Sequence, residues 1–135
     1  MFLISQDLDK GTMLPYIKHI QSRGWGVVVT NTNHNEDPDT GAPIPGSQGP
    51  EQHAATVWDQ LLAGTRTQRI VIIAHSYGGV VTMSLASSRD MSRLAGVFLT
   101  DSVHYGLSGD EDMDKRLVKI GKNYVTSEEV IFLYI

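Results

Sequence analysis

The sequence has no cysteine among its 135 residues. This absence excludes disulfide frameworks and thiolate metal sites, and it fits an intracellular or a secreted chain equally well. Basic residues are also scarce, because 11 Lys and Arg stand against 15 Asp and Glu and give a formal net charge of -4. Without a basic surface we expect no direct contact with the phosphates of nucleic acid. A protein or small-molecule partner is favoured.

Long hydrophobic runs are missing as well. No segment approaches the roughly 20 apolar residues that cross a bilayer, and the apolar start at residues 1–4 is too short for the core of a signal peptide. We therefore expect no membrane partner. The composition, 41% hydrophobic and 19% charged, is that of a globular chain with one core. We expect one domain over residues 1–135.

The stretch Arg69–Gly79 organises the rest of the chain. The β-branched run Ile70–Ile73 predicts a buried central strand, and a helical pattern follows directly after the glycines. Between them stands Ala-His-Ser-Tyr-Gly-Gly, which is the strand–turn–helix context of a nucleophile elbow centred on Ser76. Ala74 replaces the first glycine of G-x-S-x-G, a mild change because alanine is nearly as small.

The elbow offers a specific chemistry. A helix N-terminus directly behind Ser76 supplies free N–H groups, so the N–H of Tyr77 would bind a developing oxyanion and Gly78 and Gly79 would allow the tight turn. His75 adjoins the serine, but neighbouring side chains diverge at a tight turn, so we interpret it as structural. The alternative is a glycine-rich turn with a surface serine.

The other expected elements alternate between helices and strands. A helix capped by Thr12 ends at Gly24, a strand covers 25–30, a long irregular loop covers 32–50, a helix runs from Pro50 to Gly64, and a strand covers 94–100. The second helix carries an apolar stripe, with His53 beside it as a boundary residue. The stripe consists of Ala54, Val57, Trp58 and Leu61.

Polar residues follow two of the predicted strands. Strands separated by helices are expected to be parallel, with right-handed crossovers, so their carboxyl ends meet at one edge of the sheet. Such an edge is where open α/β sheets bind ligands. It would collect Ser76, Asp101 and His104, with Asn31, Asn33 and Ser102 at the rim of the pocket.

The end of the chain carries weaker signals. Residues 108–114 are acidic and predict a solvated loop, since their glycine and glutamate offsets do not fit a calcium loop. Leu117, Val118 and Ile120 suggest a short helix. The apolar run 130–135 has the composition of a strand with nothing after it, so we expect a partial domain.

Six segments, in order over roughly residues 5–127, resemble the argonaute-binding-protein-two (Arb-two) domain family in its animal cotranscriptional-regulator branch. Any hydrolase could carry the serine motif, but its combination with Leu-Thr-Asp-Ser-Val-His is specific to that family. The segments are Asp7–Thr12, Pro15–Lys18, Gly26–Val29, Pro50–His53 with Val57–Asp59, Ala74–Gly79 and Leu99–His104.

The resemblance implies a three-layer, α/β-hydrolase-like parallel sheet with helices on both faces. It also implies an argonaute-associated adaptor in small-RNA-linked chromatin silencing or splicing control, with argonaute and chromatin or splicing factors as partners, in the nucleus and cytoplasm. No cofactor or metal is implied. The family's upstream His-Gly loop and its late histidine are not in this chain.

Two function classes therefore compete. In a serine hydrolase, Ser76 attacks an acyl carbon, His104 takes its proton and Asp101 orients the histidine. In an adaptor, the same fold is a scaffold for a protein surface. Since the parts of the family named above are missing, we favour the adaptor and expect this chain to be inactive as it stands.

Overall fold

The computed structural model describes residues 12–104, 109–126 and 132–133. The chain divides into two compact units, Met1–Thr30 and Asn31–Ile135, which are described one at a time. Among the described helices, none has the length and apolar character needed to cross a membrane.

The first unit contains helix α2, Leu14–Ser22. Its start differs by one residue from the prediction, because the N-cap is Met13 and not Thr12. Pro15 lies in the first turn, where its missing N–H costs nothing, and the Thr12 hydroxyl accepts a hydrogen bond from the N–H of Leu14 at 3.3 Å. The end of the helix is as predicted. Gly24 has φ of +74°, the left-handed conformation in which glycine commonly ends helices.

The predicted strand over residues 25–30 is wrong. This segment forms no regular element, and the side chains of Trp25, Val28 and Val29 are exposed. The run of valines has strand propensity, but a strand exists only where a neighbour accepts its backbone hydrogen bonds. In the part of the chain that the structure describes, residues 25–30 pair with no strand.

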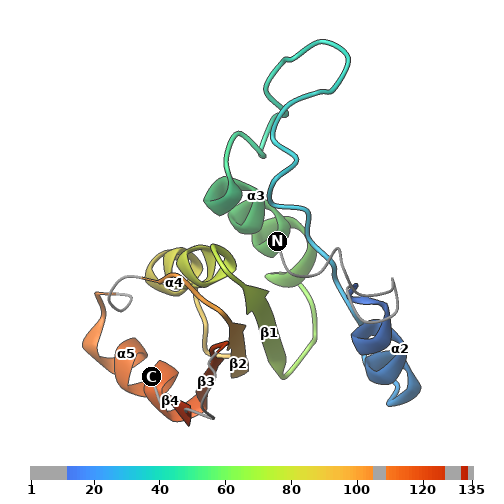
Figure 1. Cartoon of the computed structure of the whole chain (residues 1–135). Helices are drawn as coiled ribbons and strands as arrows, with labels where there is room; N and C mark the ends of the chain where they lie inside the picture. Colours follow the sequence, from blue (N-terminus) through green and yellow to red (C-terminus); the bar gives the residue numbers. More distant parts are fainter. Residues whose placement is uncertain (1–11, 105–108, 127–131, 134–135) are drawn as a thin grey trace. The chain divides into compact units, whose positions relative to one another are not determined.

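The second unit is an α/β fold around a four-stranded sheet with the order β1-β2-β3-β4 (Figure 1). Strands β1 (Ile70–His75), β2 (Leu94–Thr100) and β3 (Gly121–Tyr124) are parallel, and β4 (Phe132–Leu133) is antiparallel to β3. The expected parallel pairing of β1 with β2 is confirmed, with Ala74 opposite Leu99 and His75 opposite Thr100.

Helices α4 (Gly78–Ser88) and α5 (Glu111–Ile120) connect the parallel strands. Both crossovers step across the sheet in the same direction, so right-handed connections place both helices on one face. The alternation along β1 agrees, since Ile72 and Ala74 pack against the core while Ile73 on the other face is exposed. Helix α3 (Pro50–Val57) packs against α4.

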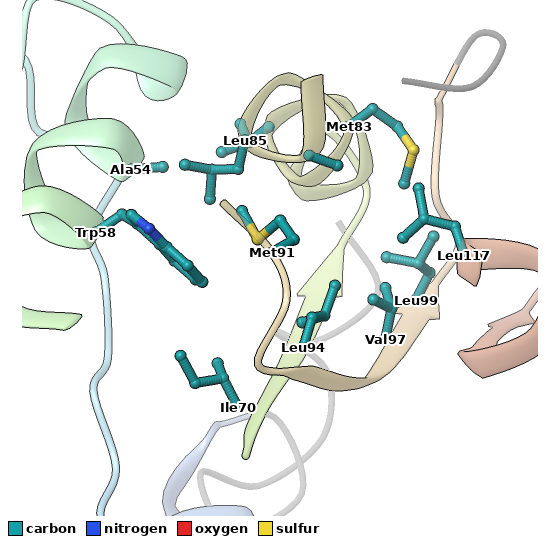
Figure 2. Packing of buried hydrophobic residues seen from close by; sticks show 12 residues of the cluster. Ala54, Trp58, Ile70, Met83, Leu85, Met91, Leu94, Val97, Leu99 and Leu117 are labelled. Carbon is teal, nitrogen blue, oxygen red and sulfur yellow. The ribbon is translucent and has the colours of Figure 1, made fainter. Parts of the chain in front are cut away.

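The core lies between this face of the sheet and the helices (Figure 2). Trp58 reaches from its helix toward Met91, while Leu117 of α5 approaches Leu99 of β2. The side chain of Leu99 has no exposed surface. The most deeply buried side chains are Met91, Leu94, Val97, Leu99 and Leu117.

Two expectations for the sheet are wrong within residues 31–135. The run Ile70–Ile73 is not a central strand, because β1 pairs only with β2 and therefore lies at the edge. Helices do not cover both faces of the sheet in this unit, because α4 and α5 occupy the same one. A run made only of apolar residues is compatible with a strand buried on two faces and with one buried on a single face, so the sequence does not distinguish them.

The second predicted helix contains a change of helical type. After α3 the chain continues as a π-helical turn, η1 (Trp58–Leu62). The wider turn shifts the residues that follow it, so Leu61 of the predicted stripe is 56% exposed and Leu62 packs against the core instead. Arg89 at the end of α4 binds both carboxylate oxygens of Asp59, at 2.8 and 2.9 Å, which ties η1 to α4.

The elements after β2 differ in part from the prediction. The acidic stretch is not only loop, because Asp110 caps α5 through hydrogen bonds from the N–H groups of Asp112 and Met113, and residues 111–114 form its first turn. Acidic residues there are favoured by the helix dipole. Strand β3 is unpredicted. Of the apolar run 130–135, only Phe132–Leu133 is among the described residues.

Candidate functional site

Ser76 stands at the turn from β1 into α4, as the elbow motif predicts. Its φ is +52°, a left-handed conformation that costs a non-glycine residue energy and is found preferentially at functional sites. Hydrogen bonds hold this conformation from both sides. The N–H of Ser76 donates to the carbonyl of Thr100 at 3.0 Å, and its carbonyl accepts from the N–H groups of Gly79 at 3.1 Å and Val103 at 3.2 Å.

Asp101 stands at the corresponding position after β2. Its φ is +46°, so a second strained residue lies at the same edge of the sheet. Its N–H donates to the carbonyl of Tyr124 at 2.7 Å. Both oxygens of its carboxylate are occupied by Thr126, whose N–H donates to Oδ1 at 2.6 Å and whose hydroxyl donates to Oδ2 at 2.8 Å.

This arrangement sets the charge of Asp101. The two hydrogen bonds from Thr126, first the one from its N–H and then the one from its hydroxyl, lower the pKa of Asp101 below its usual value. Nearby His75 lowers the pKa further through its charge. Asp101 is therefore a carboxylate at neutral pH, as a triad acid should be, but its partner is a threonine.

His104 is held by Ser102. The Oγ of Ser102 and the Nδ1 of His104 lie 2.7 Å apart. This pair sits against the start of α4, where a Cβ added at Gly79 would lie 1.8 Å from the Ser102 Oγ and 3.4 Å from the His104 Cβ. Gly79 therefore has to be glycine for the loop after β2 to pack this closely.

The side chains of the two residues that flank Ser76 are hydrogen-bonded to other parts of the chain. The Nδ1 of His75 lies 2.9 Å from the carbonyl oxygen of Thr100, so the ring is held by the neighbouring strand. The Tyr77 hydroxyl donates to Oε1 of Glu51 at 2.6 Å, and this hydrogen bond, ahead of the charge of Glu51, raises the pKa of Tyr77. The elbow is thereby linked to the first turn of α3.

Asn31 and Asn33 are not placed at a strand end. They were predicted there because they follow residues 25–30, but that segment is not a strand. Both side chains are exposed in the loop that precedes α3, and the carbonyl of Asn31 accepts a hydrogen bond from the N–H of His34 at 3.1 Å. No strand end therefore places them at the edge of the sheet that carries Ser76.

The loop before α3 is fastened by a small polar network. The buried hydroxyl of Ser47 donates to the carbonyl of His34 at 2.7 Å and lies 2.9 Å from the Nδ1 of His53. Since the hydroxyl has one proton, His53 donates from Nδ1 in this arrangement. The Nδ2 of Asn35 adds a hydrogen bond to the carbonyl of Ser47 at 2.8 Å. His53 therefore has the structural role that its position beside the stripe predicts.

The structure brings together Ser76, Ser102 and His104, but it does not assemble the proposed relay. An Asp-His-Ser triad needs the acid to hold one nitrogen of the histidine while the other nitrogen faces the serine. Here the carboxylate of Asp101 binds Thr126, and the Nδ1 of His104 binds Ser102. The α4 N-terminus behind Ser76 could still stabilise negative charge.

Two residues of the site were not found from the sequence. Thr126 follows β3, a strand of Gly-Lys-Asn-Tyr without any β-branched residue, so no pattern indicates that it returns to this edge. Glu51 reads from sequence only as a first-turn acidic residue. Among the described residues no group of three histidines, aspartates or glutamates could hold a metal ion.

Comparison with known proteins identifies related chains. Residues 34–131 match the family model described as Arb2 domain. A FAM172 family protein homolog of Caenorhabditis elegans is 40% identical over 101 residues, which is 74% of this chain and 32% of that protein. The cotranscriptional regulator ARB2A of mouse is 27% identical over 156 residues, or 76% of this chain and 37% of that protein.

Human cotranscriptional regulator ARB2A gives a similar match, 27% identical over 155 residues with 76% of this chain and 37% of the human protein covered. The chain thus spans about a third of the length of these curated relatives. No solved structure matches the chain significantly.

Proposed function

The chain belongs to the Arb2 domain family, and from this premise we propose that it serves cotranscriptional regulation as a protein-binding adaptor rather than as an enzyme. Its relatives in mouse and human are named cotranscriptional regulators, which supports a regulatory role. The finer proposal follows the family resemblance. The chain would associate with an argonaute protein and with chromatin or splicing factors, in the nucleus and cytoplasm, and would use an α/β-hydrolase-like scaffold.

One observation carries the adaptor over the enzyme. Each carboxylate oxygen of Asp101 accepts a hydrogen bond from Thr126, which joins the ends of β2 and β3, and among the described residues no histidine is hydrogen-bonded to this carboxylate. The net charge of -4 supports a contact made through protein rather than through RNA.

A second candidate, ester hydrolysis at Ser76, is favoured by the strained φ of that residue. The strain is the one expected of a nucleophile elbow. The positions of Asp101 and His104 weigh against it, since neither is bonded to the other among the described residues. We therefore retain the elbow as an architectural feature of the proposed adaptor.

Co-precipitation with nuclease treatment tests the proposal. The tagged chain is expressed in cells, the extract is divided, and one half is treated with RNase and DNase before argonaute is measured in the bound fraction. Equal recovery from both halves is expected if the contact is between proteins. Loss of argonaute in the treated half would show that nucleic acid joins the two and would contradict the adaptor proposed here.

A further inference from the structure

Strand β1 has an unpaired backbone edge within residues 31–135. In a parallel pair, every second residue directs both its N–H and its C=O to the neighbouring strand. The N–H of Ile70 donates to the carbonyl of Arg93 at 2.8 Å, and beyond the strand the N–H of Ser76 donates to the carbonyl of Thr100 at 3.0 Å. The even-numbered residues therefore face β2. The residues that face outward are Val71, Ile73 and His75, and in the described part of this unit none of their backbone groups is hydrogen-bonded.

This outward edge lacks the features that usually keep an edge strand from pairing. Such features include charged side chains, proline and a bulge that bends the strand. The strand reads Ile-Val-Ile-Ile-Ala-His, and the irregularity of its register lies between Ile70 and Val71, before the outward-facing residues. The side chains of Val71 and Ile73 are 43% and 39% exposed, and that of His75 is exposed as well. An uncharged, exposed edge of this kind is a template for another strand.

The outward-facing residues are self-complementary about Ile73. When two copies of β1 run antiparallel with Ile73 on a two-fold axis, Ile73 lies opposite the same residue of the second copy, and Val71 lies opposite His75. Each of these is a hydrogen-bonded pair, because the outward groups recur at every second residue of both strands. No pair places two like charges opposite each other, which would oppose pairing.

We propose that β1 is the dimerisation edge of this chain, to which a second copy adds its own β1 antiparallel, so that two four-stranded sheets become one continuous sheet. A second copy is favoured over an unrelated peptide because one strand sequence satisfies both sides of the axis, so every contact is made twice. Each copy would donate its outward N–H groups and accept at its outward carbonyls. The proposal does not depend on the regulatory function.

The absence of cysteine makes the register directly testable. In the proposed dimer the two Cα atoms of residue 73 lie about 5.5 Å apart, within the range of about 4.4 to 6.8 Å that a disulfide spans. Ile73→Cys should therefore give a disulfide-linked dimer under mild oxidation. Val71→Cys is the matched control, because residue 71 has similar exposure and the same edge. Its two copies would be offset by about 13 Å along the strands, too far for a disulfide.

The expected result is linking that follows this register. Ile73→Cys should link about tenfold or more faster than Val71→Cys, as a difference of 1.4 kcal/mol would give. A mixture of Val71→Cys and His75→Cys should link as fast as Ile73→Cys, since these two residues lie opposite each other. The mixture also tests the register if Ile73→Cys does not fold, which circular dichroism checks for each variant.

Sedimentation velocity measures the dimer without a cross-link. The dimer fraction of the unsubstituted chain should rise with concentration. Ile73→Glu should weaken dimerisation by about tenfold, because it replaces an apolar pair at the axis with two carboxylates. Phe98→Glu should leave dimerisation unchanged, because Phe98 lies beside Ile73 with 38% exposure but belongs to β2, away from the edge.

Three results would overturn the proposal. A chain that stays monomeric at every concentration, with the cysteine variants folded and unlinked, would show that the edge is covered by other residues or takes another partner. Equal linking of Ile73→Cys and Val71→Cys would show collisions without a fixed register. Dimerisation that is weakened by Phe98→Glu and not by Ile73→Glu would place the contact on the face of the sheet instead.

Discussion

Thr126 donates two hydrogen bonds to Asp101, one to each carboxylate oxygen, and so joins the residue after β2 to the segment after β3. The pairing is short, at 2.6 and 2.8 Å, and it accompanies a strained φ of +46° at Asp101. The aspartate that looks like a catalytic acid in the sequence is thus a connection between neighbouring strands. The sequence pattern of a hydrolase site is therefore present, while the Asp101 carboxylate holds two strand ends together.

The first prediction concerns the titration of Asp101. Its pKa lies below the usual value of about 3.9, so its bonds to Thr126 add stability above that pH, and the added stability is lost as the pH falls through the lowered value. Thr126→Val should raise the pKa part of the way, since the N–H bond remains, and Thr126→Ser should leave it low. Carboxyl NMR titration measures both. A pKa at or above the usual value in the unsubstituted chain would refute the assignment.

The second prediction is that Ser76 is not an activated nucleophile. A missing general base alone removes about 10² to 10⁴ in rate. Incubation with a fluorophosphonate, followed by mass spectrometry, should show no stoichiometric labelling of the chain. Labelling that disappears in Ser76→Ala and in His104→Ala would establish a working serine–histidine pair instead.

The third prediction concerns the contact at Gly79. In Gly79→Ala the added Cβ would lie 1.8 Å from the Ser102 Oγ, so Ser102 has to rotate and give up its hydrogen bond to His104. Overpacking of this kind costs about 1 to 3 kcal/mol. Denaturant unfolding measures the loss of stability, and the imidazole nitrogen signals of His104 report the lost bond.

Gly64→Ala is the matched control for that experiment. A Cβ at Gly64 would meet nothing within 4 Å, and no positive φ is required there. Its unfolding midpoint should stay close to that of the unsubstituted chain. Equal unfolding midpoints of the two alanine variants would show that the close approach of Ser102 to Gly79 does not contribute to stability.

The fourth prediction tests the position of the core. Leu99 is completely buried under the helices, so Leu99→Ala should cost about 2 to 5 kcal/mol of the free energy of unfolding. Leu61 is 56% exposed because of the π-helical turn. Leu61→Ala should therefore change the free energy of unfolding by no more than about 0.5 kcal/mol. Urea unfolding of both variants measures these changes in the free energy of unfolding. Similar costs would mean that the stripe continues through Leu61 as the sequence suggests.

Local signals predicted much of the fold. The bounds of β2, the Gly24 helix end and the strand–turn–helix around Ser76 all depend on residues that are close in the sequence, such as the glycines and the β-branched runs. The pairing of strands that are distant in the sequence was predicted less well. Residues 25–30 have the composition of a strand, but whether a strand forms depends on a neighbour that composition does not reveal.

Only part of the site could be predicted from the sequence. Ser76, Ser102 and His104 were placed at one edge because parallel strands end together, and the structure brings them there. The partner of Asp101 could not be predicted, because Thr126 comes from a strand without a recognisable pattern. Val71 shows the same limit, since its apolar run gives no sign that one face of the sheet is open.

The measurement that most directly tests the adaptor proposal is the affinity of the purified chain for purified argonaute, without nucleic acid, compared between the unsubstituted chain and Ser76→Ala. Both are expected to bind, with dissociation constants within about twofold of each other, or about 0.4 kcal/mol. Val97→Asp, which places an unpaired charge at a buried position, should abolish binding through unfolding. Absence of binding by the unsubstituted chain, or its loss in a folded Ser76→Ala, would contradict the account, and the second result would make the elbow itself the binding or catalytic site.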